Sequence, residues 1–184
     1  MSIKLNAVEV KKLKESFGEA FYLLDSNQFK INFLELKKAF CDIYSNFNIA
    51  YSYKTNYTPK LCKIVNELGG YAEVVSEMEM ELALCIGVNP EKIIWNGPIK
   101  NPEKMEEFLL IGGVINIDSI EEMETIKTVV SKYPDKVFKL GIRCNYDVND
   151  DVISRFGFDV AGEDFKKVLS FVSAEKNVKF VNLQ

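Results

Sequence analysis

An α/β fold of the (β/α)8 barrel type is predicted by two features of the sequence. Short apolar stretches alternate with helical patterns six times between residues 49 and 183, which is typical of parallel strands with helices outside them. Several of these strands also turn polar at their carboxyl ends, where barrel enzymes place their active sites. Six strands of the eight that close a barrel are expected, so the barrel is predicted to be incomplete.

The predicted elements follow one another without a linker or a low-complexity segment. Strands are expected over residues 20–24, 49–54, 72–76, 93–96, 114–118, 137–145 and 179–183. Helices are expected over residues 29–40, 59–68, 77–86, 102–111, 120–132 and 163–176. Glycine pairs at 69–70 and 112–113 come directly after two of these helices, where glycine readily ends a helix.

Polar side chains at the strand ends share one alternation. Asn96 ends the third barrel strand, Asn116 and Asp118 share one face of the fourth, and Arg143 and Asn145 share one face of the fifth. Side chains along a strand point alternately to opposite faces, so these groups are expected on one side of the sheet. Helix capping would explain one such residue, Asp118 for example, but it explains five together less well.

Composition excludes several kinds of site. The 184 residues include no histidine, which excludes Ser-His-Asp and Cys-His catalysis by this chain alone. The net charge is −4 and no apolar run is long enough to span a bilayer, so we expect no nucleic-acid or membrane partner and a cytoplasmic location. Four widely separated cysteines, at 41, 62, 85 and 144, are expected to be buried, reduced thiols rather than disulfides or metal ligands.

Lys54 stands where the first barrel strand becomes a polar loop. Tyr51 and Tyr53 are predicted to point to the face that lies under helices, whereas Ser52 and Lys54 point to the opposite face. A desolvated lysine loses its proton more easily and becomes a nucleophile. A surface lysine at a strand end is the alternative that this stretch alone leaves open.

Six segments resemble, in order, the motifs of fold-type III pyridoxal-phosphate enzymes, the diaminopimelate/ornithine decarboxylase group. They are residues 51–56 (Tyr-Ser-Tyr-Lys-Thr-Asn), 67–76 (Glu-Leu-Gly-Gly-Tyr-Ala-Glu-Val-Val-Ser), 96–100 (Asn-Gly-Pro-Ile-Lys), 115–119 (Ile-Asn-Ile-Asp-Ser), 143–145 (Arg-Cys-Asn) and 154–157 (Ser-Arg-Phe-Gly). The first is similar to the Tyr-Ala-Val-Lys-Ala-Asn motif that contains the cofactor lysine of the family. The resemblance therefore implies the N-terminal barrel portion of such an enzyme, an alanine racemase-like domain.

The resemblance also implies an activity and a set of site residues. Lys54 would form the internal aldimine with pyridoxal 5'-phosphate and assist decarboxylation of an amino acid, with a basic or diamino acid as the expected substrate. A racemase of the same fold is an alternative, because residues 155–158 are also similar to that branch. The residues that the resemblance places at the cofactor are Lys54, Glu73, Arg143, Asn145, Ser154 and Arg155.

The chain departs from the family pattern in what it lacks. We find no histidine segment, no Gly-rich phosphate loop and no β-domain of the family. We therefore expect residues 1–25 to form a segment whose strand pairs with a missing β-domain, and residues 26–184 to form a partial barrel with little activity alone. The expected partner is a second copy in the full-length context or a complementing C-terminal chain. The alternative is an inactive or split relative that binds a partner through exposed barrel edges.

Overall fold

The computed structural model describes residues 3–146 and 154–184, and the chain divides into two compact units, Met1–Asn48 and Ile49–Gln184. The first unit contains helices α1 (Ala7–Phe17) and α2 (Ser26–Cys41). Helix α1 begins with a capping box, in which the Asn6 side chain accepts from the Glu9 backbone and the Glu9 carboxylate accepts from the Asn6 backbone.

The short strand predicted over residues 20–24 is not formed. These residues connect α1 and α2 without regular secondary structure. A strand needs a neighbour for its backbone N–H and C=O groups, and no strand in the described part of the chain pairs with this segment. The pairing of this segment with another domain, and the domain boundary after residue 25, stay predictions.

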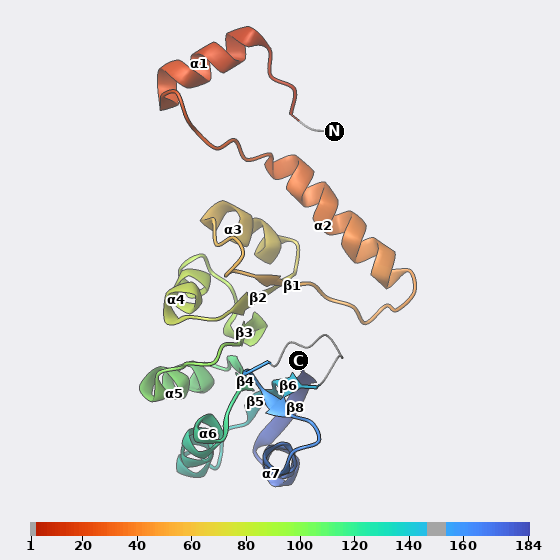
Figure 1. Ribbon diagram of the computed structural model, residues 1–184, viewed down its shortest axis with the longest axis vertical. Coiled ribbons are helices and arrows are strands. Elements are labelled where there is room, and N and C mark those ends of the chain that lie inside the picture. Colours follow the sequence, from red (N-terminus) through yellow and green to blue (C-terminus); the bar gives the residue numbers. More distant parts are fainter. Residues whose placement is uncertain (1–2, 147–153) are drawn as a thin grey trace. The chain divides into compact units, whose positions relative to one another are not determined.

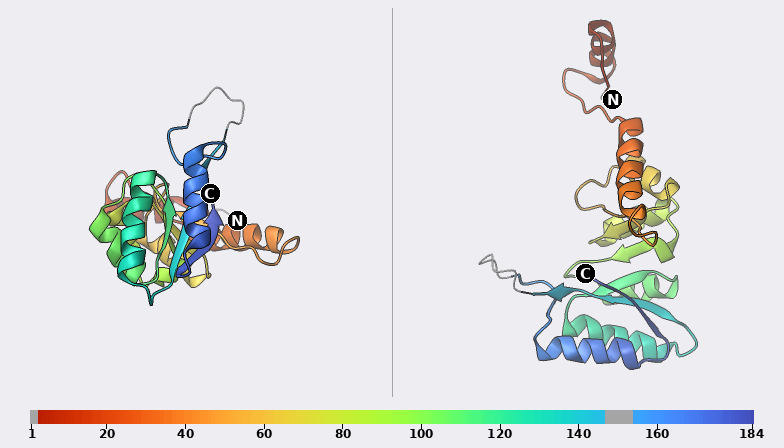
Figure 2. Two further views of the ribbon diagram at one scale, coloured as in Figure 1. Left: turned by 90° about the horizontal axis from the view of Figure 1, so that it is seen from below. Right: turned by 90° about the vertical axis from the view of Figure 1, so that its right-hand side faces the viewer.

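Six parallel strands form the centre of the second unit (Figure 1). Their order follows the sequence, as in a (β/α)8 barrel, and Figure 2 shows their colours running from yellow to blue. Within the described residues the sheet has two free edges, at its first and last strands. The prediction of an incomplete barrel-type α/β fold is confirmed. The strands are β1 (Ala50–Ser52), β2 (Tyr71–Val74), β3 (Ile93–Trp95), β4 (Val114–Ile117), β5 (Phe138–Ile142) and β8 (Val178–Leu183).

Five helices follow the strands and pack along one face of the sheet (Figure 1). Trp95 of β3 lies edge-on against Phe108 of α5, with 5.7 Å between the ring centroids. The glycine pairs end α3 and α5 as predicted, because the Gly70 and Gly113 backbone N–H groups donate to Val65 and Phe108. The helices are α3 (Pro59–Glu67), α4 (Glu77–Cys85), α5 (Pro102–Leu110), α6 (Ile120–Lys132) and α7 (Glu163–Ala174), and a 3-10 turn, η1 (Pro90–Lys92), precedes β3.

A second, two-stranded sheet lies beyond the carboxyl end of β5. It pairs β6 (Cys144–Asn145) with β7 (Phe158–Asp159) in parallel. The strand predicted over residues 137–145 is therefore divided at Arg143 into β5 and β6. The polar loop predicted over residues 146–154 lies mostly outside the described residues. No helix in the described ranges is long and apolar enough to cross a membrane.

The four cysteines are free thiols, as predicted. Their predicted burial holds for Cys62, which is fully buried under β1. It is wrong for Cys85, which is exposed at the end of α4. Cys41 and Cys144 are partly buried.

Candidate active site

The face of the sheet that points away from the helices is polar at its carboxyl edge. Trp95, Ile115 and Ile117 belong to the hydrophobic core beneath the helices, so strand alternation places Asn96 and Asn116 on the opposite face. These two side chains are nevertheless only 3% and 2% exposed. The polar edge predicted from the strand ends is therefore present, and its amides are buried.

Glu73 and Asn96 are the first pair of predicted polar residues that the fold joins. Glu73 lies in β2, opposite Ser52 of β1 in the strand register. Asn96 follows β3 and donates a hydrogen bond from Nδ2 to Glu73 Oε1 over 3.1 Å. Both side chains are buried, so this hydrogen bond forms away from bulk water.

Arg143 is fixed from three directions. Its guanidinium donates to Asp118 Oδ1 over 2.8 Å and lies 4.7 Å above the centre of the Phe156 ring. Its backbone carbonyl accepts from the Phe158 backbone N–H at 2.8 Å. The ion pair joins the ends of β4 and β5, and it is mostly buried on the Asp118 side.

Asn145, Ser154 and Arg155 belong to the contacts around Arg143 and Phe156. The Asn145 side chain donates to the Ser154 backbone carbonyl over 2.8 Å, and the Arg155 guanidinium lies 5.5 Å from the centre of the Phe156 ring. The Phe156 ring therefore makes cation–π contacts with the guanidinium groups of both Arg143 and Arg155. Asn145, Ser154 and Arg155 are parts of a rim that is more exposed than the buried amides of β3 and β4.

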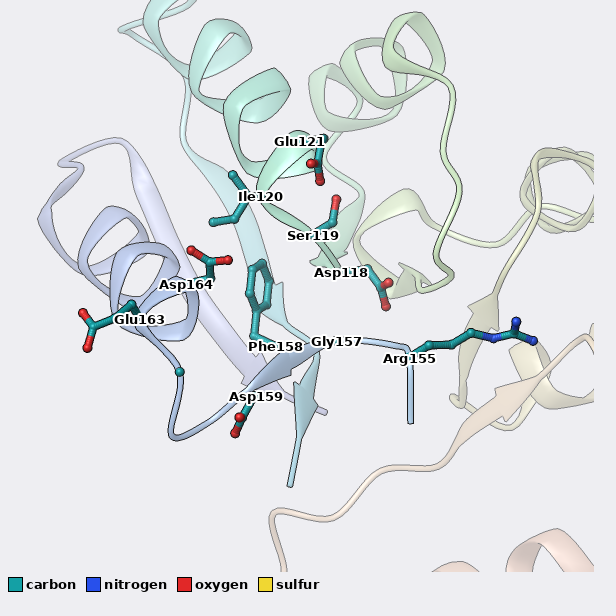
Figure 3. A pocket seen from close by; sticks show the side chains of 11 residues that line it. Asp118, Ser119, Ile120, Glu121, Arg155, Gly157, Phe158, Asp159, Glu163 and Asp164 are labelled. Atoms are coloured by element: carbon teal, nitrogen blue, oxygen red, sulfur yellow. The ribbon is translucent and has the colours of Figure 1, made fainter. Parts of the chain in front are cut away.

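A pocket of about 450 Å³ lies behind this rim, between the starts of α6 and α7 (Figure 3). Figure 3 shows the Phe158 ring pointing toward Ile120, while the Arg155 side chain extends away from Glu163 and Asp164. Five carboxylates line this pocket and Arg155 is its one cation among the described residues. The excess of negative charge makes the pocket a poor place for a phosphate group.

Lys54 follows β1 in a turn, and its side chain is exposed. The burial expected for a desolvated lysine is therefore wrong for Lys54 in this structure, because β1 is an edge strand with no neighbour on its outer side among the described residues. The alternation predicted for the same stretch is confirmed for its tyrosines, because Tyr53 is 1% exposed and packs in the core with Tyr51 beside it. Lys54 lies in the turn beyond the last strand residue, Ser52.

Three further residues of this face were not found from the sequence, namely Gly141, Asn182 and Gln184. Asn116 Nδ2 donates to Gln184 Oε1 over 2.9 Å, which joins β4 to the end of β8. A methyl group at Gly141 would overlap the side-chain oxygens of Asn116 and Asn182. Isolated amides near a strand end carry little signal, and only the neighbouring glycine in β5 hints that two side chains need its space.

Four oxygens on this polar side have no hydrogen-bond partner among the described residues. They are Ser52 Oγ, Asn96 Oδ1, Asn116 Oδ1 and Asn182 Oδ1, and all four are buried. A buried polar atom without a partner is costly, so such a group calls for an explanation. Their concentration beside Glu73 and the β4 and β5 ends marks this face as one prepared for a polar ligand.

The comparison with protein families identifies the family of the chain and the cofactor of that family. The family described as pyridoxal-dependent decarboxylase, pyridoxal binding domain, matches residues 27–183. The chain belongs to this family. The predicted family and its cofactor, pyridoxal 5'-phosphate, are thereby confirmed.

Individual relatives agree with the family. The chain is 29% identical to the diaminopimelate decarboxylase of Aquifex aeolicus, over 97% of this chain and 43% of the relative. It is 30% identical to that of Helicobacter pylori strain J99, over 76% of this chain and 34% of the relative. The pyridoxal-binding domain described here thus spans less than half the length of these curated relatives.

Solved structures show the same fold. Diaminopimelate decarboxylase from M. jannaschii, in complex with L-lysine, matches with a TM-score of 0.82 and 26% identity, over 95% of this chain and 43% of that one. Lysine/ornithine decarboxylase from Vibrio vulnificus matches with a TM-score of 0.71 and 22% identity, over 98% of this chain and 46% of that one. The second likeness is evidence for the fold alone.

The residues of this pyridoxal-binding domain fit the cofactor. Pyridoxal phosphate carries an aldehyde, a ring hydroxyl, a ring nitrogen and a phosphate, so it needs an amine and several polar partners. The domain offers the Lys54 amine at the end of β1, the unpartnered buried oxygens of β1, β3, β4 and β8, and the Arg143 guanidinium. The ring hydroxyl and the protonated ring nitrogen of the cofactor would donate to some of the oxygens that otherwise have no partner.

Proposed function

We propose that this domain supplies Lys54 and the polar face beside it to a pyridoxal-phosphate-dependent amino-acid decarboxylase. The observation that carries the proposal is the group of buried oxygens without partners on the polar face of the sheet, one of which belongs to Ser52, two residues before Lys54. Bound there, pyridoxal phosphate would supply an electron sink for the pair left behind when carbon dioxide departs. This chemistry needs an amine nearby, because the substrate must replace the protein at the aldehyde carbon.

Lys54 Nζ is the group we assign to cofactor attachment. Its side chain is accessible, and the buried Tyr53 next to it anchors the backbone from which it projects. Once released by the substrate, the same amine can hold a proton at Nζ and return it to the substrate carbon. The buried Glu73 and its partner Asn96 would orient the polar edge of the ring from β2 and β3.

Arg143, Asn145, Ser154 and Arg155 form the opposite wall in this proposal. Arg143 places a fixed positive charge at the end of β5, suited to an anionic oxygen of the cofactor or the substrate. Asn145 and Ser154 hold the rim segment together through their 2.8 Å hydrogen bond. Arg155 is assigned a weaker electrostatic role, because its side chain extends away from the adjoining pocket (Figure 3).

The proposed substrate is an amino acid with a second amino group. Support comes from the relatives, which are named diaminopimelate decarboxylases, and from the M. jannaschii structure, which was solved with L-lysine. The same names favour decarboxylation over racemisation. We propose action in the cytoplasm, together with a second copy of the chain or a complementing C-terminal chain.

A second candidate function is partner binding without catalysis. It is favoured by the outer edges of β1 and β8, which pair with no further strand in the described part of the chain and can accept another strand. In this alternative the exposed Lys54 amine has no special role.

Titration with pyridoxal phosphate separates the two functions. Binding through Lys54 should give the 184-residue chain a new absorbance band, and Lys54→Ala should abolish it. Lys60→Ala is the matched control, because Lys60 is also exposed and lies six residues away in α3. An equal band in Lys54→Ala and wild type would contradict the catalytic proposal.

A further inference from the structure

Lys100 is a buried lysine that the proposed chemistry does not use. Its side chain is 0% exposed, and burial lowers the pKa of its ammonium group while the Glu122 carboxylate opposes that shift. Nζ donates to the backbone carbonyls of Gly97, at 2.6 Å, and Asn116, at 3.0 Å. It also lies 2.8 Å and 2.9 Å from the two carboxylate oxygens of Glu122. All the hydrogens of the ammonium group are therefore engaged.

The contacts of Glu122 continue from Lys100 toward the site. Glu122 Oε2 accepts from the Asp118 backbone N–H over 3.0 Å, and the Asp118 side chain accepts from Arg143 over 2.8 Å. The chain of contacts thus runs from Lys100 through Glu122 and Asp118 to the Arg143 guanidinium. It starts at the Asn116 carbonyl of β4, to which Lys100 donates, and ends at Arg143, which we assign to the cofactor site.

The fold contains a second copy of the helix start without the lysine. Ser76 and Glu79 begin α4 as Ser119 and Glu122 begin α6, each serine accepting from the glutamate backbone at 3.3 Å. Glu79 Oε2 accepts from the Val75 backbone N–H over 2.8 Å, as Glu122 does from Asp118. Capping the helix therefore needs only the serine and the glutamate.

The buried Lys100 contacts the start of α6, the helix start in which an aspartate precedes the serine. Val75 occupies that place before α4 and carries no charge, whereas Asp118 holds Arg143. Lys100 also donates to the Asn116 carbonyl, two residues before Asp118, and its partner Glu122 accepts from the Asp118 backbone N–H, so the chain leading into the aspartate is held at two points. Capping alone does not account for this addition.

We propose that Lys100 and Glu122 are positioning residues, which hold Asp118 and through it fix the Arg143 guanidinium at the site. The proposal rests on the proposed function for the meaning of Arg143, but the arrangement itself can be tested without cofactor. It predicts that removal of the Lys100–Glu122 pair loosens Arg143 while the fold persists.

The test uses the two arginines of the chain, Arg143 and Arg155. In the cofactor-free protein their Nε–H groups give two NMR signals, which Arg155→Lys assigns. The variant is Lys100→Met with Glu122→Leu, a double replacement that leaves no unpaired buried charge. The matched control is Glu79→Leu, which removes the equivalent acceptor from α4.

We expect the double variant to move the Arg143 signal toward that of Arg155 and to speed its hydrogen exchange at least about threefold. Glu79→Leu should leave the Arg143 signal in place. An unchanged Arg143 signal in the folded double variant would overturn the proposal, and so would an equal change in Glu79→Leu. If the double variant does not fold, Glu122→Gln gives the same comparison with its control Glu79→Gln.

Pyridoxal phosphate binding gives the second measurement. The dissociation constant for pyridoxal phosphate should be about fivefold or more higher in the double variant than in Glu79→Leu. The absorbance band of the bound cofactor should still depend on Lys54. Equal affinities would contradict a positioning role. If the wild-type chain binds no pyridoxal phosphate, the proposed function fails, but the NMR comparison still decides whether Lys100 and Glu122 hold Arg143.

Discussion

Asn96 donates its side-chain N–H to the Glu73 carboxylate over 3.1 Å, between residues that are 3% and 9% exposed. The two side chains come from neighbouring parallel strands and lie on the face away from the helices. The hydrogen bond satisfies one oxygen of Glu73, yet Asn96 Oδ1 has no partner among the described residues. The pair is therefore built for a further group that donates a hydrogen bond.

Asn96→Asp should destabilise the domain at neutral pH. It replaces a donor by a second buried carboxylate next to Glu73, and two carboxylates at this distance repel each other unless they share a proton. We expect a loss of about 2 kcal/mol or more in the free energy of unfolding at pH 7, measured by urea titration. Asn96→Ala, which adds no charge beside Glu73, should lose less stability than Asn96→Asp.

Gly141→Ala should destabilise the sheet at β4, β5 and β8. The added methyl group would overlap the Asn116 and Asn182 side-chain oxygens, and overpacking of this kind costs about 1–3 kcal/mol. Thermal or urea unfolding measures the loss. Asn182→Ala combined with Gly141→Ala removes one of the two overlaps and should recover part of the stability. Full stability in Gly141→Ala alone would show that these amides do not occupy the space over the glycine.

Tyr53 and Cys62 should make the domain less stable at alkaline pH. Burial raises the pKa of the Tyr53 hydroxyl and of the Cys62 thiol. A raised pKa in the folded state means that stability is complete below the ordinary pKa, about 8.5 for cysteine and 10 for tyrosine, and falls as the pH rises further.

The loss is up to about 1.4 kcal/mol for each group per pH unit above these values. Urea unfolding between pH 7 and pH 11 measures the slope. Tyr53→Phe should reduce the fall in the free energy of unfolding above pH 10. Cys62→Ala should reduce the fall above pH 8.5. Tyr22→Phe, at a fully exposed position, is the control and should leave the slope as in wild type.

Gly157→Ala should loosen the rim that carries Arg155. Gly157 has a φ of +75°, and a side chain there would bring its Cβ to 2.7 Å from the Arg143 carbonyl oxygen. We expect a loss of about 1–3 kcal/mol and faster amide exchange at Phe158, whose N–H donates to the same carbonyl. Unchanged exchange at Phe158 in Gly157→Ala would contradict the role assigned to this glycine.

Much of the barrel could be predicted because its elements are marked locally. Pro102 starts α5 and Gly112 follows it, and Ile115 and Ile117 alternate with polar residues. The spacing of the apolar residues and the residues that begin and end the helix therefore indicate the same element boundaries. Helix α1 was not predicted although Asn6 and Glu9 form a capping box, because its lysine-rich pattern has little apolar periodicity. The strand over residues 20–24 failed for a non-local reason, since local residues do not supply a partner strand.

The candidate site also contains residues that the local sequence predicts and contacts that it does not. Asn116, Asp118 and Arg143 were predicted because they follow strands on a consistent face. Their partners depend on the pairing of distant strands, so the contacts of Gln184 and Glu122 could not be deduced from spacing. The exposure of Lys54 also depends on tertiary context, because burial of a strand end is decided by its neighbour in the sheet.

The attachment of pyridoxal phosphate to Lys54 is the central claim, and borohydride reduction followed by peptide mass spectrometry tests it most directly. After incubation with pyridoxal phosphate, the peptide containing Lys54 should carry the phosphopyridoxyl mass at substoichiometric cofactor, ahead of the exposed Lys60. The buried, fully paired Lys100 should remain unmodified in the folded protein. Equal labelling of Lys54 and Lys60, or selective labelling of another lysine, would contradict the account.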